Sequence, residues 1–298
     1  MGLKEADITR YLCAAAHLDW ESRTKVIDQV LEEEHKAIGP SFGVNLIALL
    51  KQCLAARRRK RIRDLSLALL LLICLFVVIS SENLWSIVPF WLIAWGITFA
   101  EIWISYYKVI AKYFSKEHFD PDAISYLCNR KVDEKLEKIA SVQDGNVIVY
   151  SGFSPFIGSG FDIGGWSFAL NISKGKKEVG ETLEPLPFQV IELYDYLDDS
   201  IGSLHLDGMD IEEKLFVNGK DIRNDKRFLA DPYGRPYTKV DPELIKSFID
   251  NSTQTIRPYK YIQVIDWDGE LIVSIFLRLL KLNRNLFVKA SYCLLTPP

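Results

Sequence analysis

The residues that could most readily bind a charged ligand lie in a glycine-rich segment, SGFSPFIGSGFDIGGWSFAL, at positions 151–170. The segment follows a short apolar run, NVIVY, that has the composition of a strand. Glycine lets backbone N–H groups approach an anion closely, and loops of this kind often hold phosphate groups. The candidate ligand-binding positions are Gly158, Ser159, Gly160, Gly164 and Gly165.

The spacing of these glycines departs from the known nucleotide-binding motifs. It reads GxGxxxG rather than the GxGxxG of a dinucleotide-binding turn, and no GK[ST] of a Walker A loop follows. The next residues, GWSFALNI, alternate like a strand instead of beginning a helix. Ser154 and Ser159 lack the GxSxG frame of a hydrolase nucleophile. We therefore expect a long loop between two strands, with a ligand-binding loop as the alternative.

A second group of residues that could do chemistry is acidic. Residues 190–213 include eight Asp or Glu and no Lys or Arg, and among them stand His205, Asp207 and Asp210. Carboxylate oxygens suit a hard divalent cation, and a histidine beside acids suits acid–base chemistry. The ligand spacing of an EF-hand is missing, so the pattern favours a solvated acidic turn over a metal site. The sequence identifies no catalytic set, no metal ligands of recognisable spacing and no cofactor.

The cysteines and the net charge exclude several classes of protein. Five cysteines stand far apart without a CxxC pair, which predicts neither a zinc site nor a disulfide framework and favours a reducing compartment. They are Cys13, Cys53, Cys74, Cys128 and Cys293. The net charge is −3, from 36 Lys and Arg against 39 Asp and Glu, which argues against a nucleic-acid partner.

Two long apolar segments must position these candidate residues. Residues 65–81 contain no charge, and residues 84–107 contain one, Glu101. At the helical rise the second segment is about 36 Å long and spans the hydrocarbon core of a bilayer with some tilt. The first is near the lower length limit for a span. We expect a transmembrane helical hairpin, because helices that are apolar on every side are hard to cover in a soluble chain of this size.

Basic residues flank the apolar segments on one side. Residues 80–83, between the two segments, carry no positive charge, whereas Lys108, Lys112 and Lys116 follow the second one. A dense basic cluster directly precedes the first: Arg57, Arg58, Arg59, Lys60, Arg61 and Arg63. This asymmetry predicts that both termini are cytoplasmic and that the hairpin lies in the bacterial inner membrane. Its position also favours anionic lipid headgroups over nucleic acid as the partner of the cluster.

Glu101 is the one acidic residue inside the two apolar segments of the expected hairpin. Carboxylates within a bilayer are costly and often functional, so a proton or ion role is one interpretation. The residue lies only about 9 Å from the inner end of its helix, however, at the rise of 1.5 Å per residue. We favour pairing with an arginine or lysine near the interface, or exposure to water there.

The composition divides the chain into three consecutive segments. Residues 1–63 read as a cytoplasmic helical lobe whose last helix continues into the first span, with Asp19 as the cap of an earlier helix. Residues 64–113 form the transmembrane hairpin. Residues 114–298 have the composition of a cytoplasmic α+β domain, with a helix beginning after Asp241 and hairpin turns at Asn218-Gly219 and Asp268-Gly269.

Several pieces of the chain resemble an uncharacterised group of bacterial membrane proteins. These pieces are DITRYLCAAAHLD, LAARRRK before the first span, SGFSPFIGSG and the closing NLFVKASYCLLTP. The likeness extends over the whole chain and implies that members of the group are longer than 298 residues. It brings no activity, cofactor or catalytic residue with it.

The sequence therefore favours an inner-membrane sensor or scaffold over an enzyme. We expect a homo-oligomer whose cytoplasmic domain binds a protein partner or small ligand and acts through the hairpin, as an effector in bacterial stress or phage defence. One alternative is a membrane-anchored enzyme that acts on a phosphate-bearing substrate held by the glycine loop. The other is an oligomeric channel lined by Glu101 or Thr98.

Overall fold

The computed structural model describes residues 7–296 except 34, 36, 40–41, 82–83, 118, 121–129, 144, 153–154, 174, 176, 179–180, 183, 233 and 252. Two candidate residues, Ser154 and Cys128, and part of the connection between the apolar segments lie outside the described residues.

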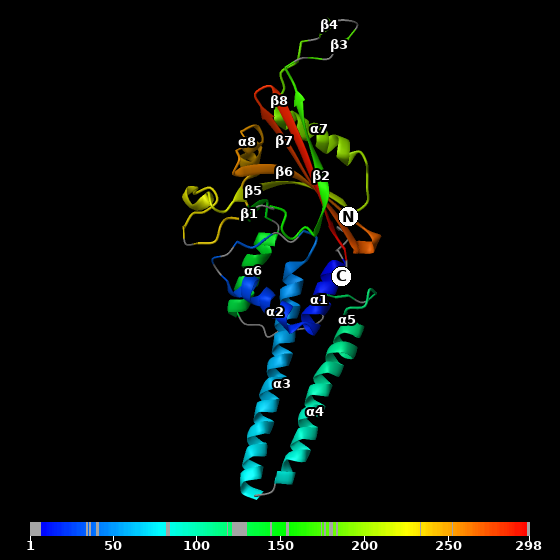
Figure 1. Cartoon of the computed structure of the whole chain (residues 1–298), viewed down its shortest axis with the longest axis vertical. Coiled ribbons are helices and arrows are strands. Elements are labelled where there is room, and N and C mark those ends of the chain that lie inside the picture. The colour runs from blue at the N-terminus through cyan, green and yellow to red at the C-terminus, as the bar shows by residue number, and fades with distance from the viewer. Residues whose placement is uncertain are drawn as a thin grey trace. The chain divides into compact units, whose positions relative to one another are not determined.

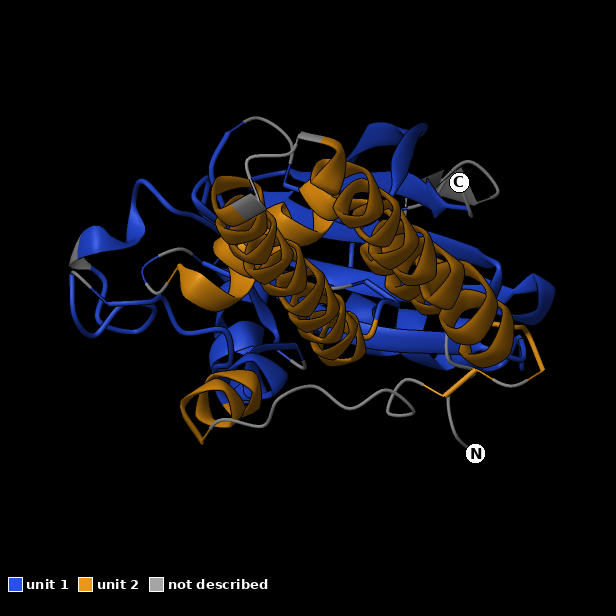
Figure 2. Cartoon of the chain, turned by 90° about the horizontal axis from the view of Figure 1, so that it is seen from below, with its two compact units in different colours: residues 1–8, 34–44, 138–298 blue, residues 9–33, 45–137 orange. Residues whose placement is uncertain are grey.

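The chain forms two compact units that are not consecutive in sequence. One unit contains residues 1–8, 34–44 and 138–298, and the other contains residues 9–33 and 45–137 (Figure 2). The first is built on a β-sheet and is called the sheet unit; the second is helical and is called the helical unit. The composition-based segments 1–63, 64–113 and 114–298 did not anticipate that residues 34–44 belong with the sheet.

The helical unit begins with short helices and continues into a long hairpin. Helix α1 spans Ile8–Leu18 and α2 spans Trp20–Val26, followed by a π-helical turn, Ile27–Glu32. Asp19 caps α2, as predicted, by accepting a hydrogen bond of 2.9 Å from the Glu21 amide. The hairpin consists of α3, Leu46–Ser81, and α4, Ile87–Trp103, which is extended by a π-helical segment, Ile104–Ile110, and by α5, Ala111–Tyr113.

Helix α3 and the helical stretch Ile87–Tyr113, which begins with α4, are both long and apolar enough to cross a membrane. They lie side by side (Figure 1), and none of the most apolar window of either helix is buried within the chain. The Phe76 side chain, for example, is 72% exposed. The prediction that the helix before the first apolar segment runs into it without a break is confirmed, because α3 is continuous over 36 residues.

The sheet unit contains six strands in the order β1-β5-β6-β7-β8-β2. Only β1 and β5 are parallel, so the arrangement is α+β with a mainly antiparallel sheet (Figure 1). The bounds are β1 Val147–Tyr150, β2 Phe161–Asn171, β5 Met209–Asn218, β6 Ile256–Asp266, β7 Leu271–Leu282 and β8 Asn285–Leu295, with a separate small hairpin of β3 Lys177–Glu178 and β4 Glu181–Thr182. The helices of the sheet unit are α7 Val190–Gly202 and α8 Pro242–Asp250, and α6, Arg130–Gln143, precedes β1.

One of the two hairpin turns predicted in this unit is confirmed and the other is wrong. Asp268-Gly269 lies in the short connection between β6 and β7. Asn218-Gly219 does form a turn, but the chain does not return to pair with β5 there. Instead Ile222 and Phe228 are buried in a cluster with Phe248 of α8, and the strand that pairs with β5 is β6. Burial of these apolar side chains outweighs local turn chemistry.

Helices α7 and α8 cover one face of the sheet, which we call the helix face. Val190 and Tyr194 of α7 pack with Leu279 of β7 and Val288 of β8. The opposite face, which we call the aromatic face, carries a cluster of rings around Phe276. The rings come from the segment before α3, the loop after β1 and three strands, and they are Phe42, Phe156, Phe216, Tyr259, Tyr261 and Phe276.

A buried lysine joins α7 to the helix face. Lys260 of β6 is 2% exposed, and its ammonium lies 2.7 Å from Asp198 of α7 and 3.0 Å from Glu213 of β5. A buried charge is tolerated only when it is paired and hydrogen-bonded. This pairing therefore fixes the position of α7 on the sheet.

We predict that Lys260→Met lowers the free energy of unfolding by about 2 kcal/mol, because two carboxylates then lose their shared cation at a desolvated site. The partial exposure of Asp198 and Glu213 keeps the loss below that of a fully buried pair. Thermal unfolding of the full chain in detergent measures it. Lys246→Met, on the exposed side of α8, is the matched control and should change stability by less than about 0.5 kcal/mol. Equal stability of the two variants would contradict the role of Lys260.

Candidate functional site

The most exposed apolar element of the sheet unit is its edge strand, β2. The strand predicted after the glycine loop is confirmed: β2 pairs antiparallel with β8 and is exposed along all of its 11 residues. Phe168 and Leu170 are 46% and 50% exposed. Trp166 stacks on Phe168 with ring centroids 5.3 Å apart, and its indole N–H donates to the Tyr292 hydroxyl at 2.7 Å. Strand β2 thus presents a row of large apolar side chains beside an open backbone edge.

The glycines of the predicted loop let the chain approach β8 closely. Gly160 has a φ of +98°, and a Cβ there would lie 2.2 Å from the Leu294 carbonyl oxygen. At Gly165 the same atom would lie 2.3 Å from the Ala290 carbonyl oxygen. Ser159 is fully buried and its hydroxyl donates to the Phe156 carbonyl at 2.6 Å. Close packing therefore accounts for these residues, and ligand binding by the loop stays a prediction.

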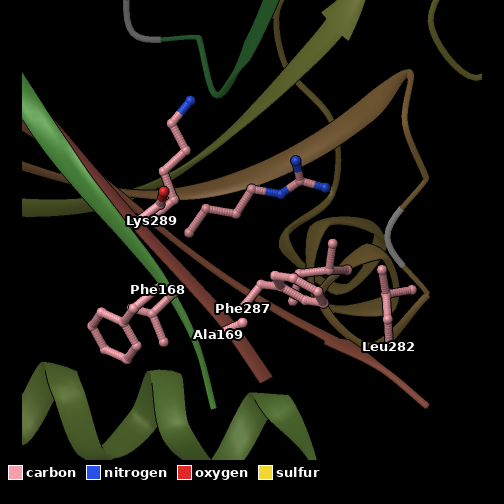
Figure 3. A pocket seen from close by; sticks show the side chains of 9 residues that line it. Phe168, Ala169, Leu282, Phe287 and Lys289 are labelled. Atoms are coloured by element: carbon pink, nitrogen blue, oxygen red, sulfur yellow. The ribbon is translucent and has the colours of Figure 1, made fainter. Parts of the chain in front are cut away.

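Two neighbouring hollows open on the aromatic face where β2, β8 and β7 run together. The larger has a volume of about 410 Å³ and is lined by Ser167, Phe168, Ala169, Arg278, Leu280, Leu282, Phe287, Val288 and Lys289 (Figure 3). The smaller, of about 300 Å³, is lined by Asp162, Gly164, Gly165, Trp166, Ser167, Lys289, Ala290 and Ser291. Lys289 and Ser167 line both. Of the five predicted loop positions, only Gly164 and Gly165 contribute to either lining.

The strand register explains the chemistry of this surface. Ser167 of β2, Lys289 of β8 and Arg278 of β7 are directly opposite one another across the three strands. Arg278 also donates to the Thr253 carbonyl at 3.4 Å, and its guanidinium lies 5.9 Å from the Tyr259 ring centroid. Burial lowers the pKa of the Arg278 guanidinium from its usual range, but arginine remains protonated at neutral pH. Two cations therefore face each other on one surface.

The acidic candidates do not form a metal site. His205 lies in the turn after α7, is exposed, and its Nδ1–H donates to the Ser203 carbonyl at 2.6 Å. Asp207 is in the following turn and Asp210 is in β5. Among the described residues no group of three or more His, Cys, Asp or Glu side chains is arranged to hold a metal ion.

In the helical unit, different residues of the basic cluster contact different partners. Arg57 pairs with Glu32 at 2.7 Å, and the Lys60 ammonium lies 4.8 Å from the Trp20 ring centroid. Arg63 of α3 lies 3.5 Å from Glu101 of α4, so of the two expected arrangements of that carboxylate, pairing or exposure to water, the structure shows pairing with a basic residue. The cluster therefore holds α2 and α4 against α3 as well as carrying charge.

Arg59 belongs to a buried network that the sequence did not reveal. It donates to Nδ1 of His17 in α1, while Nε2 of His17 lies 3.1 Å from Oε1 of Gln52. The Arg59 guanidinium can only donate, so Nδ1 of His17 accepts and carries no proton. The Gln52 carbonyl oxygen can only accept, so Nε2 carries the proton and His17 is a neutral imidazole. Burial and the positive charge of Arg59 lower the pKa of His17 to about 4. The side chain is therefore uncharged at neutral pH.

The described cysteines are free thiols. Cys13, Cys53 and Cys293 are buried and Cys74 is partly exposed. Burial raises the pKa of the Cys13 thiol to about 12, which keeps it protonated and unreactive.

These observations define an α+β domain with an exposed edge strand and adjoining hollows, carried by a chain with an apolar helical hairpin. Residues 165–298 match the family model of the AbeC-like domain. The match begins within β2 and includes α7, α8 and strands β5 to β8, so both hollows lie largely within it. No curated protein and no solved structure shows detectable similarity to the chain.

Sequence reasoning missed Arg278 and Lys289 as candidate binding residues. The alternation in LRLLKL and NLFVKAS does indicate that these cations share a strand face with apolar neighbours. Which residues lie opposite each other depends on the register of β7, β8 and β2, and two of these strands are more than 100 residues apart in the chain. A local pattern does not contain that register.

We predict that the stability of the helical unit falls as the pH drops from about 6.5 to 4. The unfolded imidazole, with a pKa near 6.5, binds a proton in this window, whereas folded His17, with a pKa of about 4, does not. Stability due to His17 is therefore complete above pH 6.5 and lost toward pH 4. The difference amounts to about 3 kcal/mol.

Unfolding of the wild type and of His17→Gln, followed in detergent at several pH values, tests this. The variant lacks the titrating group, so its stability should depend less on pH between 6.5 and 4. Parallel pH profiles for the two proteins would mean that another group is responsible.

Proposed function

We propose that this protein is a membrane-anchored effector or sensor of bacterial phage defence, whose cytoplasmic sheet unit binds a ligand or partner and acts through the α3–α4 hairpin. The observation that carries the membrane anchor is that no residue in the apolar window of either helix is buried within the chain. Exposed apolar area costs about 25 cal/mol per Å² in water, and a contiguous patch of this size is typical of a surface that another phase or partner covers.

The charges at the hairpin support the cytoplasmic placement of both units. The basic residues before α3 becomes apolar and after α4 lie at the same end of the hairpin, while its connecting turn has none. This is the distribution that the positive-inside rule assigns to an inner-membrane protein with cytoplasmic termini. Glu101 near that end is neutralised by Arg63, which favours an anchoring hairpin over a conducting one.

The similarity of residues 165–298 to the AbeC-like domain supports the link to defence, because that family is of the abortive-infection type. The similarity supports a role in defence for the sheet unit in particular, because the matched residues include most of its strands. The match assigns no catalytic residue.

The edge strand supports assembly of several copies. Soluble proteins protect long edge strands with lysine, proline or a covering segment. Strand β2 has none of the first two within Phe161–Asn171 and carries a single charge, Asp162. Antiparallel pairing of β2 with the same strand of a second copy would satisfy its open backbone groups and bury the apolar row of Trp166, Phe168 and Leu170.

We predict that the chain stays in the membrane fraction after alkaline washing and lowers the plating efficiency of at least one phage in a panel. Leu71→Asp combined with Leu72→Asp, two exposed positions of α3, should abolish both, because each charge at the centre of a span costs about 3 kcal/mol of insertion free energy.

Tyr196→Asp, at an equally exposed position of α7, is the control and should leave membrane retention intact. A fluorescent protein fused after Pro298 should fold and fluoresce if that end is cytoplasmic. Recovery of the wild-type chain in the soluble fraction would refute the membrane anchor, and protection against no phage would refute the role in defence.

We also predict that Phe168→Lys dissociates the assembly, because a cation on an edge strand opposes strand pairing. Native mass spectrometry in detergent should show oligomers for the wild type and for Tyr196→Lys, and monomers for Phe168→Lys. A disulfide between two copies of Ser167→Cys would locate the contact at β2. Monomeric wild-type protein, or an oligomer unaffected by Phe168→Lys, would contradict this assembly.

A further inference from the structure

The two hollows on the aromatic face differ in chemistry and are joined by Lys289. The rows of residues across β2, β8 and β7 change from polar to apolar along the strands. Ser167, Lys289 and Arg278 form a cationic row, and the next row on the same face is Ala169, Phe287 and Leu280, followed by Leu282. On the other side of Lys289, Gly165 and Ser291 line the smaller, polar hollow.

The cationic row is unfavourable for the sheet itself. Like charges directly opposite each other on adjacent strands destabilise the pairing. Lys289 is exposed, and within the described part of the chain no carboxylate forms an ion pair with it. Broken local rules of this kind are expected at functional sites, and two adjacent cations suit an anionic ligand.

The apolar row beside the cations is equally exposed. Phe287 is 39% and Leu282 is 49% exposed, although both lie on a face whose other half is covered by the rings around Phe276. Figure 3 shows Phe287 and Leu282 along one side of the hollow and Lys289 at the other end. A volume of about 410 Å³ with mainly apolar walls and a few polar groups at one end is typical of a small-molecule site.

We propose that this surface binds a small amphipathic anion, with its carboxylate or phosphate head at Lys289 and Arg278 and its apolar body against Leu280, Leu282 and Phe287. Ser167 and Ser291 line the smaller hollow together with Lys289 and supply hydroxyls beside the head. Lys and Arg both suit such a head group, Arg through its planar donors and Lys as a mobile point charge. The inference rests on the proposed ligand-sensing role of the sheet unit and names the chemical class of its ligand.

The charge arrangement disfavours cationic and neutral amphiphiles of the same length. A cation would add a third positive charge to the row, and a neutral alcohol would lack the negative charge that attracts Lys289 and Arg278. The anionic head is therefore the specific element, and the apolar body supplies affinity that rises with its length.

The test measures binding of octanoate and octyl phosphate to the full chain in nanodiscs of zwitterionic lipid by isothermal titration calorimetry, with empty nanodiscs subtracted. We expect both anions to bind, octanol and octyltrimethylammonium to bind at least tenfold more weakly, and hexanoate to lose about fourfold per methylene. Comparison of the two anions distinguishes a carboxylate ligand from a phosphate ligand.

Variants in the two parts of the hollow test separately how the anionic head and the apolar body of the ligand are bound. Lys289→Met should weaken octanoate binding at least tenfold, and Lys289→Arg should retain it. Leu282→Ser should weaken octanoate binding and reduce the difference between octanoate and hexanoate. Lys246→Met on α8 removes the same charge outside the hollow and is the matched control.

Binding that is unchanged in Lys289→Met, equal binding of the cationic amphiphile, or no binding of either anion would overturn the inference. The calorimetry requires neither phage nor a membrane-topology readout. Loss of phage protection with ligand binding intact would therefore count against the proposed function alone, and absence of binding with protection intact would count against the ligand alone.

Discussion

The packing of aromatic rings around Phe276 determines where the sheet is covered and where it is open. Phe156 stacks on Phe276 with centroids 4.1 Å apart, and Phe42 meets it edge-on at 5.5 Å. These two rings come from the loop after β1 and from the segment before α3, so one contact holds both irregular segments on the sheet. Interiors are packed to near-crystalline density, and the arrangement leaves little freedom to the loop that leads into β2.

The aromatic cluster ends at Phe276, and the candidate binding surface begins two residues further along β7. Phe276 is covered, whereas Arg278, two residues later on the same face, lies at the rim of the larger hollow. The end of the aromatic cluster therefore creates the boundary between core and candidate binding surface. The same loop places Ser159 and Gly160 close to β8, so this part of the glycine-rich segment positions β2, while Gly164 and Gly165 line the smaller hollow.

Charged groups hold the helices in both units, and each does so at a desolvated position. Lys260 joins α7 to the sheet through Asp198, and Arg59 joins α3 to α1 through His17. Such contacts add little net stability compared with apolar packing, but they penalise every alternative arrangement because a lost partner leaves a buried polar group unsatisfied.

The sequence alone determined the parts of the protein that depend on local chemistry. The unbroken helix through the first apolar segment, the Asp19 cap, the strand after the glycine loop and the pairing of Glu101 with a basic residue all follow from periodicity, capping preference or the cost of a lone charge in an apolar segment. These signals extend over a few residues or along one helix, so no knowledge of distant contacts was needed.

Only the tertiary structure decided the surface around Lys289 and the grouping of residues 34–44 with the sheet. Ser167, Arg278 and Lys289 become neighbours through strand register, and a shift of one residue would move each to the other face of the sheet. Asn218-Gly219 shows the same limit. This dipeptide favours a hairpin, but the residues after it bury Ile222 and Phe228 and do not return to pair with β5. Long-range packing selects among local options that are nearly equal in free energy.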